Sequence, residues 1–533
     1  MTSTRASKAV NPPRLLRDNL ESFSIAIVIA ILMKFFAIEA YQIPTSSMQP
    51  TMMGSSEAGI FDRILVDKTA FLFRDPERWE IAVFRYPQRR QQNYVKRIAG
   101  VPGDRMQIVG GNVYTLDEND RRVAQPRPAN VQDGHWKEIY PARSLARRDS
   151  KTLGTAIRSA GSAKWSESEP GTLSAKQTST SSLARLQFEN DGYEGLVNHV
   201  WDGYAPDVSR AIQKGAAPDV LEVVQDARVR VRPKTGSRPK EFTIALRFEF
   251  DDSRENPPKR TLREFRLKCG DDGNGRLEAS GTDLELKASE TFSLDVSSGP
   301  ELEFVHLDDS LYLIVDGSEV ARLDVADFTI TERMIRAGEG TGQPTGRITI
   351  DTRGGGNVTL EKLRIDRDLH YTVSSAGADA VFVVTEDHYF MLGDNTLQSV
   401  DSREWESVTI GVDAEGRIVA PDSAEAIRTL TGNSRAFPLG QRPDPDENPV
   451  PITSEGKIVF EDSLGEVWVL DGVAGDESGV WSGGSAMRFR ASDAGVAFAP
   501  NLTNDRLVRR EDILGRPLVT FWRAPWPRFL PIY

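Results

Sequence analysis

The sequence predicts a mainly β protein. Short segments in which apolar and polar residues alternate recur along much of its 533 residues, and turns rich in Gly, Asp and Pro separate them. One long apolar run near the N-terminus, residues 23–38, is instead typical of a membrane helix. The chain exceeds the usual length of one domain, so two or three folded units are expected.

Composition argues against several classes of function. The net charge of −12 argues against nucleic acid as the main partner, because phosphate binding needs a basic face. The single cysteine, Cys269, cannot form an intrachain disulfide, a thiolate metal cluster or a CxxC redox motif. Since Cys269 ends a stretch of alternating apolar residues, we predict that it is a small core residue.

The apolar run predicts a transmembrane anchor over residues 22–40. Its length is slightly below the roughly 20 residues that span a bilayer comfortably. Basic residues precede it, namely Arg5, Lys8, Arg14 and Arg17. The positive-inside rule therefore places residues 1–21 in the cytoplasm and the following chain on the outer side of the membrane. A cleavable secretory signal that ends at Ala40 is the alternative interpretation.

A β-sandwich is predicted over residues 220–370. In "EFTIALRFEFDD" every second residue from Phe242 to Phe250 is apolar, the pattern of a half-buried strand. "LEFVHLDDSLYLIVDGSEVARLDV" predicts three further strands, the last two joined by an Asp-Gly turn. Short strands at even spacing are typical of a sandwich. Residues 141–183 are rich in Ser, Ala, Arg and Thr and read as a linker or edge, so residues 105–219 are assigned to an insertion with a linker.

The last part of the chain is predicted to hold a second insertion and a final strand. Residues 413–499 are strand-rich after a Pro-rich break, and residues 500–533 hold a strand followed by an aromatic tail. In the tail, Trp522, Trp526 and Phe529 stand among arginines. Core packing and contact with a membrane interface both fit this pattern.

A candidate nucleophile follows the apolar run, in "YQIPTSSMQPTM" (residues 41–52). Pro44 and Pro50 restrict the backbone around its serines, but a serine needs a base within hydrogen-bond reach. None of the five histidines lies in a recognisable catalytic motif. A lysine can replace histidine when burial favours its neutral form, and Lys96 in "NYVKRIAGVPGD" has apolar neighbours on a predicted strand.

Four segments, in order, resemble the type I signal peptidase family. They are "IPTSSMQPT", "DRILVDK", "EIAVFRYP" with "YVKRIAGVPGD", and "MLGDNTLQSVDSREW". The resemblance covers residues 1–104, 376–412 and 500–533, less than half of the chain. It implies an antiparallel β catalytic domain, with residues 41–104 as its first part, interrupted by the insertions. The sandwich itself is similar, in a generic way, to laminin-G and concanavalin-like folds.

The resemblance implies a role for each matching residue. Ser47 would be the nucleophile, Lys96 the general base, and Ser399 would orient the lysine amine. The Ser47 N–H and the Thr45 hydroxyl would form the oxyanion hole. A supporting ionic cluster would consist of Arg97, Asp394, Asp401 and Arg403. Two departures stand out: Arg78-Trp79-Glu80 replaces a frequent Arg-Gly-Asp, and Gln398 replaces a frequent Asn.

The predicted function is removal of signal peptides from exported preproteins, after small residues of the Ala-x-Ala type, by an enzyme of the inner membrane. No cofactor is implied. The rival hypothesis is a membrane-tethered sandwich that binds an unknown ligand beside an inactive peptidase domain. The acidic pairs at residues 251–252, 271–272 and 308–309 lie at predicted turns, where aspartates without a metal are common, so no metal site is assigned and calcium stays open. The oligomeric state also stays open.

Overall fold

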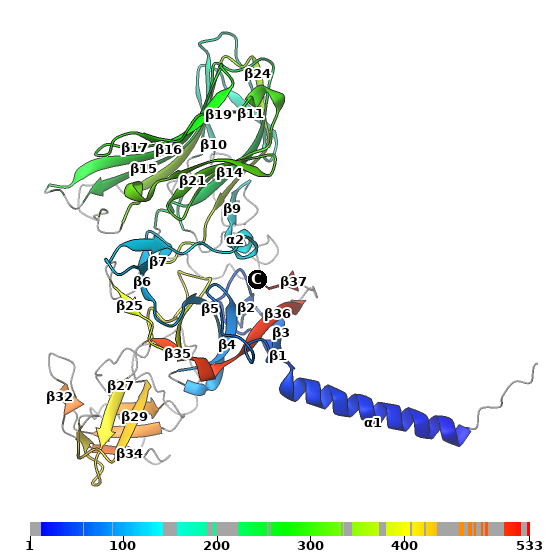
Figure 1. The fold of residues 1–533 in the computed structure, drawn as a ribbon, viewed down its shortest axis with the longest axis vertical. Coiled ribbons are helices and arrows are strands. Elements are labelled where there is room, and N and C mark those ends of the chain that lie inside the picture. Colours follow the sequence, from blue (N-terminus) through cyan, green and yellow to red (C-terminus); the bar gives the residue numbers. More distant parts are fainter. Residues whose placement is uncertain are drawn as a thin grey trace, which may run out of the picture.

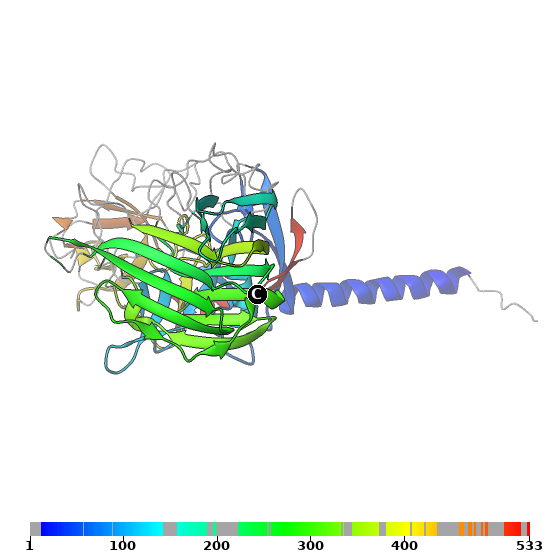
Figure 2. The ribbon, with the colours of Figure 1, turned by 90° about the horizontal axis from the view of Figure 1, so that it is seen from above.

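A computed structural model describes most of the chain. The described residues are 12–56, 58–87, 89–141, 157–188, 196–198, 222–252, 255, 257–331, 334, 344–372, 380–405, 408–419, 423–433, 458–462, 467–471, 474–475, 481–482, 485–488, 506–523 and 530–532. The strands form several sheets that lie next to one another, and one long helix projects from them (Figures 1 and 2). The fold is mainly β, as the alternating sequence pattern predicts.

Helix α1 (Pro12–Phe36) carries the apolar run, and its apolar side chains are largely exposed. It extends away from the body of the molecule (Figure 1). Within the described residues, no helix has the length and apolar character that crossing a bilayer requires. The predicted end of the anchor at residue 40 is wrong, because residues from Ile38 onward form strand β1 (Ile38–Gln42), whose backbone pairs with β3 (Ile60–Asp67).

The first sheet, which we call the catalytic sheet, contains the predicted nucleophile and base segments. Its strand order is β1-β3-β36-β4-β5-β26-β35, with β2 on β3 and β37 on β36, and all pairs are antiparallel. The remaining strands are β2 (Gly54–Ser55), β4 (Ile81–Tyr86), β5 (Arg89–Gly100), β26 (His388–Leu392), β35 (Leu507–Arg509), β36 (Ile513–Arg523) and β37 (Leu530–Pro531). Segments from both ends and from the middle of the chain therefore meet in one sheet.

A small four-stranded sheet and a short helix follow β5. The sheet has the order β25-β6-β7-β8 and consists of β25 (Phe382–Val383), β6 (Arg105–Val109), β7 (Asn112–Leu116) and β8 (Arg122–Ala124). Helix α2 (Ala129–His135) comes next and buries Val131, Gln132 and His135. These elements lie between the catalytic sheet and the sandwich (Figure 1).

The sandwich consists of two eight-stranded sheets that share one apolar core. The first is ordered β10 (Ile157–Gly161), β13 (Leu183–Phe188), β23 (Thr345–Arg353), β15 (Glu241–Asp252), β16 (Lys259–Gly270), β17 (Asn274–Gly281) and β18 (Lys287–Ala288), with β19 (Phe292–Ser293) on β17. The second is ordered β11 (Trp165–Glu169), β12 (Thr172–Lys176), β24 (Asn357–Arg367), β14 (Ala227–Thr235), β20 (Leu302–Leu307), β21 (Ser310–Val315) and β22 (Ser318–Asp324), with β9 (Lys137–Tyr140) on β24.

The sandwich is larger than its predicted range. Five strands between residues 137 and 188 belong to it, in a region that the sequence predicts to be insertion and linker. Within the predicted range the strands agree with the sequence: Phe242, Ile244 and Phe250 are at most 1% exposed, and β20, β21 and β22 follow the expected order of strands and turns. Three short 3-10 helices are Val296–Ser298, Ala326–Phe328 and Arg510–Asp512.

A separate six-stranded sheet forms much of the described part of the second insertion. Its order is β28 (Ile418–Val419), β27 (Val408–Val412), β29 (Arg428–Asn433), β30 (Ile458–Asp462), β31 (Val467–Asp471) and β34 (Ser485–Arg488), and β32 (Ala474–Gly475) pairs with β33 (Trp481–Ser482). Since β27 begins at Val408, the catalytic part ends before the predicted boundary at residue 412. Residues 524–529 of the predicted aromatic tail lie outside the described residues.

Candidate active site

Strand β5 positions the predicted base. Lys96 lies opposite Ala82 of β4, and its side chain is 2% exposed because β5 is an interior strand of the catalytic sheet. Its Nζ donates a hydrogen bond of 2.8 Å to Oγ of Ser399. The loop after β26 supplies Ser399, so a contact across 303 residues of sequence depends on the pairing of β5 with β26.

The predicted nucleophile lies in a turn between β1 and β2. Ser47 is 8% exposed, and its carbonyl oxygen accepts a hydrogen bond of 3.1 Å from the backbone N–H of Asn395. The next residue, Met48, is buried in an apolar cluster with Ile43 and Val83. The turn is therefore held in place by the packing of Met48 and by the hydrogen bond from the loop that carries Ser399.

Ser47 and Lys96 line one pocket of about 100 Å³. The predicted oxyanion residue Thr45 also lines it, together with Tyr41, Gln42, Ile43, Pro44, Met48, Val83, Tyr86, Asn93, Tyr94, Val95 and Val400. Apart from the two catalytic candidates and a few polar groups, the lining is apolar. The amine of Lys96 therefore lies among mainly apolar side chains and away from bulk solvent.

One half of the predicted ionic cluster lies directly behind Lys96. Arg97 donates two hydrogen bonds to Asp394, from Nε at 2.9 Å and from a terminal nitrogen at 2.8 Å, and both side chains are at most 1% exposed. Thr51 donates a third hydrogen bond to this carboxylate. Burial opposes the charge on Asp394, but the Arg97 guanidinium outweighs burial and holds the pKa of this carboxyl below its usual value.

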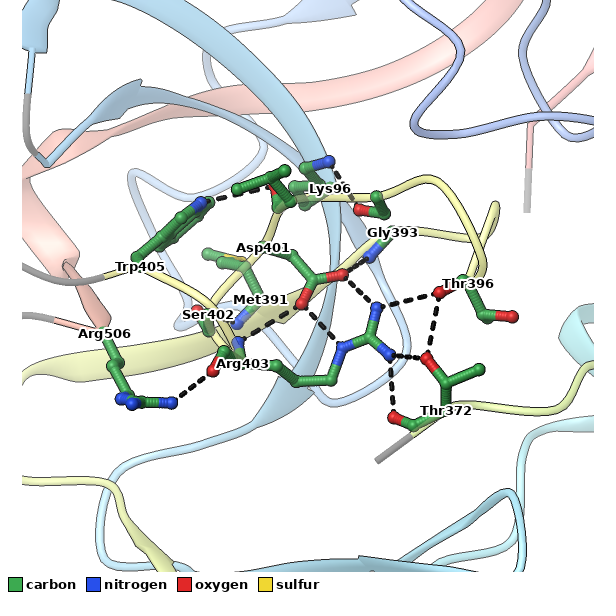
Figure 3. A network of polar contacts seen from close by, with 12 residues as sticks. Lys96, Thr372, Met391, Gly393, Thr396, Asp401, Ser402, Arg403, Trp405 and Arg506 are labelled. Atoms are coloured by element: carbon green, nitrogen blue, oxygen red, sulfur yellow. Dashed lines mark hydrogen bonds and ion pairs between the residues drawn. The ribbon is translucent and has the colours of Figure 1, made fainter. Parts of the chain in front are cut away.

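The other half of the cluster shapes the loop that carries Ser399 (Figure 3). Asp401 accepts hydrogen bonds from Nε of Arg403 at 2.8 Å and from the backbone N–H of Gly393 at 2.9 Å. Arg403 in turn donates to the carbonyl of Thr372 at 2.8 Å. Burial opposes the Asp401 charge, yet the Arg403 guanidinium keeps the pKa of Asp401 below its usual value.

Gly393 lies where the two serine segments approach each other. A β-carbon at this position would lie 2.0 Å from the Ser399 Oγ and 2.5 Å from the Ser47 carbonyl oxygen. Non-bonded carbon and oxygen atoms do not approach so closely. The glycine therefore allows the nucleophile turn to contact the loop that holds the lysine.

Buried residues from the insertion surround the Arg97–Asp394 pair, and sequence reasoning did not identify them. His135 of α2 is 1% exposed and its Nε2 lies 3.9 Å from Asp394. Burial, and then the nearby Arg97 charge, lower the pKa of His135 well below its usual value, so the ring is neutral at pH 7. No sequence signal marks such residues, because their burial depends entirely on how the insertion packs.

Lys137, at the start of β9, is expected to make the free energy of unfolding depend on pH. Its side chain is buried, and burial lowers the pKa of its amine to about 8 although Asp394 attracts the charge. The unfolded chain keeps an ordinary lysine pKa of about 10.4. Between pH 8 and about 10.4 the unfolded state therefore binds more protons, so the free energy of unfolding rises with pH. We expect Lys137→Met to remove this rise, which is worth about 3 kcal/mol.

The measurement is the urea midpoint of the wild type and of Lys137→Met between pH 7 and pH 10. The variant should be the more stable protein at pH 7, and the difference should shrink towards pH 10. Lys68→Met is the matched control, since Lys68 is 29% exposed in an ion pair with Glu39. A difference between the wild type and Lys137→Met that stays constant with pH would contradict the prediction.

Other residues singled out from the sequence lie in the sandwich. Cys269 is 1% exposed in its core, and burial raises the pKa of the thiol to about 12, in agreement with a core role. The pair Asp308-Asp309 forms the turn between β20 and β21. Within the part of the chain that the structure describes, no group of three or more His, Cys, Asp or Glu side chains has the geometry of a metal site.

A buried lysine bonded to one serine, in a pocket with a second serine, brings together an amine and a hydroxyl, the two kinds of group that a serine nucleophile and its base require. Sequence comparison specifies the family. Residues 16–160 and 321–420 match the family described as signal peptidase, peptidase S26. These two ranges hold Ser47, Lys96 and Ser399, and together they make up slightly less than half of the chain.

Named relatives agree with this family. Over 103 residues, 18% of this chain and 44% of the relative, the sequence is 40% identical to a probable signal peptidase I-2 of Synechocystis sp.. It is 37% identical over 107 residues, 18% of this chain and 36% of the relative, to signal peptidase I of Pseudomonas aeruginosa. The chain thus spans less than half the length of these curated relatives.

Solved structures are also similar to this chain, with low TM-scores. A galectin-like protein of unknown function from Bacillus subtilis has a TM-score of 0.24 at 8% identity, covering 44% of this chain and 98% of that one. Carbohydrate binding module CBM66 of Bacillus subtilis has a TM-score of 0.20 at 8% identity, covering 39% and 94%. Scores this low carry no conclusion about the ligand of the sandwich.

Proposed function

We propose that this protein is a serine endopeptidase that removes signal peptides from exported preproteins through an acyl-enzyme. The observation that carries the proposal is the buried Lys96, whose Nζ is 2.8 Å from the Ser399 Oγ and which lines one pocket with Ser47. The match of residues 16–160 and 321–420 to the signal peptidase family supports it.

In the proposed reaction, the neutral Lys96 amine takes the hydroxyl proton of Ser47 while Oγ attacks the scissile carbonyl carbon. The Ser47 N–H and the Thr45 hydroxyl would stabilise the oxyanion. The tetrahedral intermediate collapses when Lys96 returns the proton to the leaving amine. Lys96 then deprotonates a water that hydrolyses the acyl-enzyme and regenerates Ser47. Ser399 would orient the amine throughout.

The shape of the pocket supports small side chains in the substrate. The pocket is small, about 100 Å³, and its lining includes Ile43, Met48 and Val95. Cleavage after Ala-x-Ala is therefore our proposed specificity. An extended substrate would pair with β5, where residues 93–96 line the pocket beyond the part of the strand that pairs with β26.

We also propose attachment to a membrane through α1. Apolar side chains such as Phe23, Val28 and Leu32 are 50–65% exposed on a helix that packs against little of the protein. A helix that is apolar on several faces is stable only when something covers it. The topology with a cytoplasmic N-terminus and an outer catalytic domain rests on the sequence alone. Recovery of the full-length protein away from phospholipid vesicles in a flotation assay would contradict the attachment.

The test of the function is cleavage of a purified preprotein by the full-length protein in detergent. We expect a single cut that releases the signal peptide, and N-terminal sequencing of the product should place it after a small residue. A protein that binds preprotein or other ligands without cutting would instead favour the rival, an inactive peptidase domain carrying a binding sandwich.

A further inference from the structure

The residue Trp79 has an unusual backbone conformation close to the catalytic sheet. Its φ is 73°, in the left-handed region that side chains other than glycine rarely adopt. Its side chain is nevertheless 2% exposed. A strained backbone persists only where surrounding contacts hold it in place, and such strain concentrates at functional sites. The contacts of Trp79 therefore indicate which residues its strained conformation holds in place.

The backbone of Trp79 is fixed to strand β5, which carries the proposed base. Its N–H donates to the carbonyl of Ile98 at 2.7 Å, and the N–H of Ile98 donates to Glu80 at 2.8 Å. The Trp79 carbonyl accepts a hydrogen bond of 2.7 Å from the Arg97 guanidinium. Arg97 directly follows Lys96, so a displacement of Trp79 would move the residue next to the base.

The indole of Trp79 is contacted from the insertion. The guanidinium of Arg127 lies 4.9 Å from the centre of the Trp79 ring and 5.8 Å from that of Tyr371. Arg127 is in turn paired with Asp368 at 2.6 Å, and both side chains are 1% exposed. Gln132 of α2 donates to the same carboxylate at 2.7 Å. These contacts fix the guanidinium in one position.

Asp368 connects this cluster to the sandwich. It directly follows β24, a central strand, and its N–H donates to the carbonyl of Asp226 at 2.9 Å. A continuous series of buried contacts thus runs from the sandwich through Asp368, Arg127 and Trp79 to Arg97. The predicted insertion therefore packs, through Arg127, against a residue of the catalytic part that is hydrogen-bonded to the neighbour of Lys96.

We propose that Arg127 of the insertion is a positioning residue for the peptidase reaction: it holds Trp79, and through the Trp79 carbonyl it sets the place of Arg97 and Lys96. This inference rests on the proposed function and assigns the insertion a part in it. Removing the contact should leave substrate binding intact, because neither Arg127 nor Trp79 lines the pocket. It should instead slow the chemical step.

The chain offers a matched control for this contact. Arg228 lies 4.6 Å from the centre of the Trp136 ring and pairs with Asp366 of the same strand β24 at 3.0 Å. Trp136 packs on Val305 and Leu307 in the sandwich. Arg127 and Arg228 thus make the same pair of interactions, but only the first contacts Trp79.

The experiment compares Arg127→Lys and Arg228→Lys in the full-length protein with a preprotein substrate. Lysine keeps the positive charge of arginine but lacks the planar guanidinium that stacks on the indole ring. We expect Arg127→Lys to lower kcat by about tenfold or more, with KM changed less than about twofold, since small displacements of catalytic groups are costly. Arg228→Lys should leave both parameters within about twofold, and the thermal midpoints of the two variants should fall by similar amounts. Equal losses of kcat in the two variants, or a change confined to KM, would overturn the proposal.

Variants of Trp79 test whether Arg127 acts through the indole. Trp79→Phe keeps a ring face and should retain most of the activity, whereas Trp79→Ala should lower kcat as Arg127→Lys does. In the Trp79→Ala background, Arg127→Lys should lower kcat by less than about twofold further. Fully additive losses would overturn the proposal, and these variants decide it if Arg127→Lys alone fails to fold. An inactive wild type would instead remove the proposed function itself.

Discussion

Replacement of Lys96 by arginine is expected to lower kcat/KM for preprotein cleavage by about 10⁴-fold. General-base catalysis contributes up to about that factor. Arginine keeps its proton at any working pH, so it preserves the positive charge and removes the basicity. Lys96→Met removes the amine while keeping an unbranched side chain in the buried position, and it should lose activity to the same extent. Ser47→Ala provides the reference value for loss of the nucleophile.

Controls separate the loss of a base from a loss of structure. Lys68→Arg changes a lysine of the same sheet region that is 29% exposed in an ion pair with Glu39, and it should keep wild-type activity. Circular dichroism and the thermal midpoint should show that Lys96→Met is folded. If Lys96→Arg retained a tenth or more of wild-type kcat/KM, the lysine would not be the base, and a different proton acceptor would have to be found in the pocket.

Gly393→Ala is expected to lower kcat/KM by about 10²-fold or more. The added methyl group would lie 2.0 Å from the Ser399 Oγ and 2.5 Å from the Ser47 carbonyl oxygen. One segment or the other must move, which separates Ser399 from Lys96 or Ser47 from the pocket, and misplacement by about 1 Å costs activity on this scale. Overpacking also destabilises a protein, by about 1–3 kcal/mol, so the thermal midpoint should fall as well.

Gly134→Ala is the matched control for the added methyl group. Gly134 lies in α2, and a β-carbon there would meet nothing within 4 Å. Its activity and thermal midpoint should stay close to those of the wild type. Activity of Gly393→Ala within about threefold of the wild type would mean that the two loops can separate without harm, and the tight contact between them would then have no catalytic role.

The sequence predicts the candidate site better than it predicts the molecule around it. Ser47, Lys96 and Ser399 are identified from motifs, and the structure brings them to one place because β5 pairs with β26. Strand β15 is equally clear, since its alternate phenylalanines give a strong apolar pattern. These are cases in which a few residues with characteristic chemistry or a strong local period decide the outcome.

The strands β10 to β13 show where sequence reasoning fails. Their buried positions are occupied partly by Ala175 and Ala184, which give little contrast with the surrounding Ser and Thr residues. Strands β12 and β13 pair with β24 and β23, far along the chain, and β11 and β10 pair with β12 and β13 in turn. Pairing rather than local preference therefore decides that these segments are strands. The burial of Arg127 is hidden for the same reason, because it depends on Asp368, 241 residues later.

The position of β36 between β3 and β4 has a consequence for biosynthesis. Both neighbours of this strand emerge from the ribosome early, while β36 follows only after both insertions have been made. Until then the two early strands have no common partner, and the catalytic sheet is incomplete. Every strand of the sandwich is therefore synthesised before the catalytic sheet receives the strand that joins its two halves.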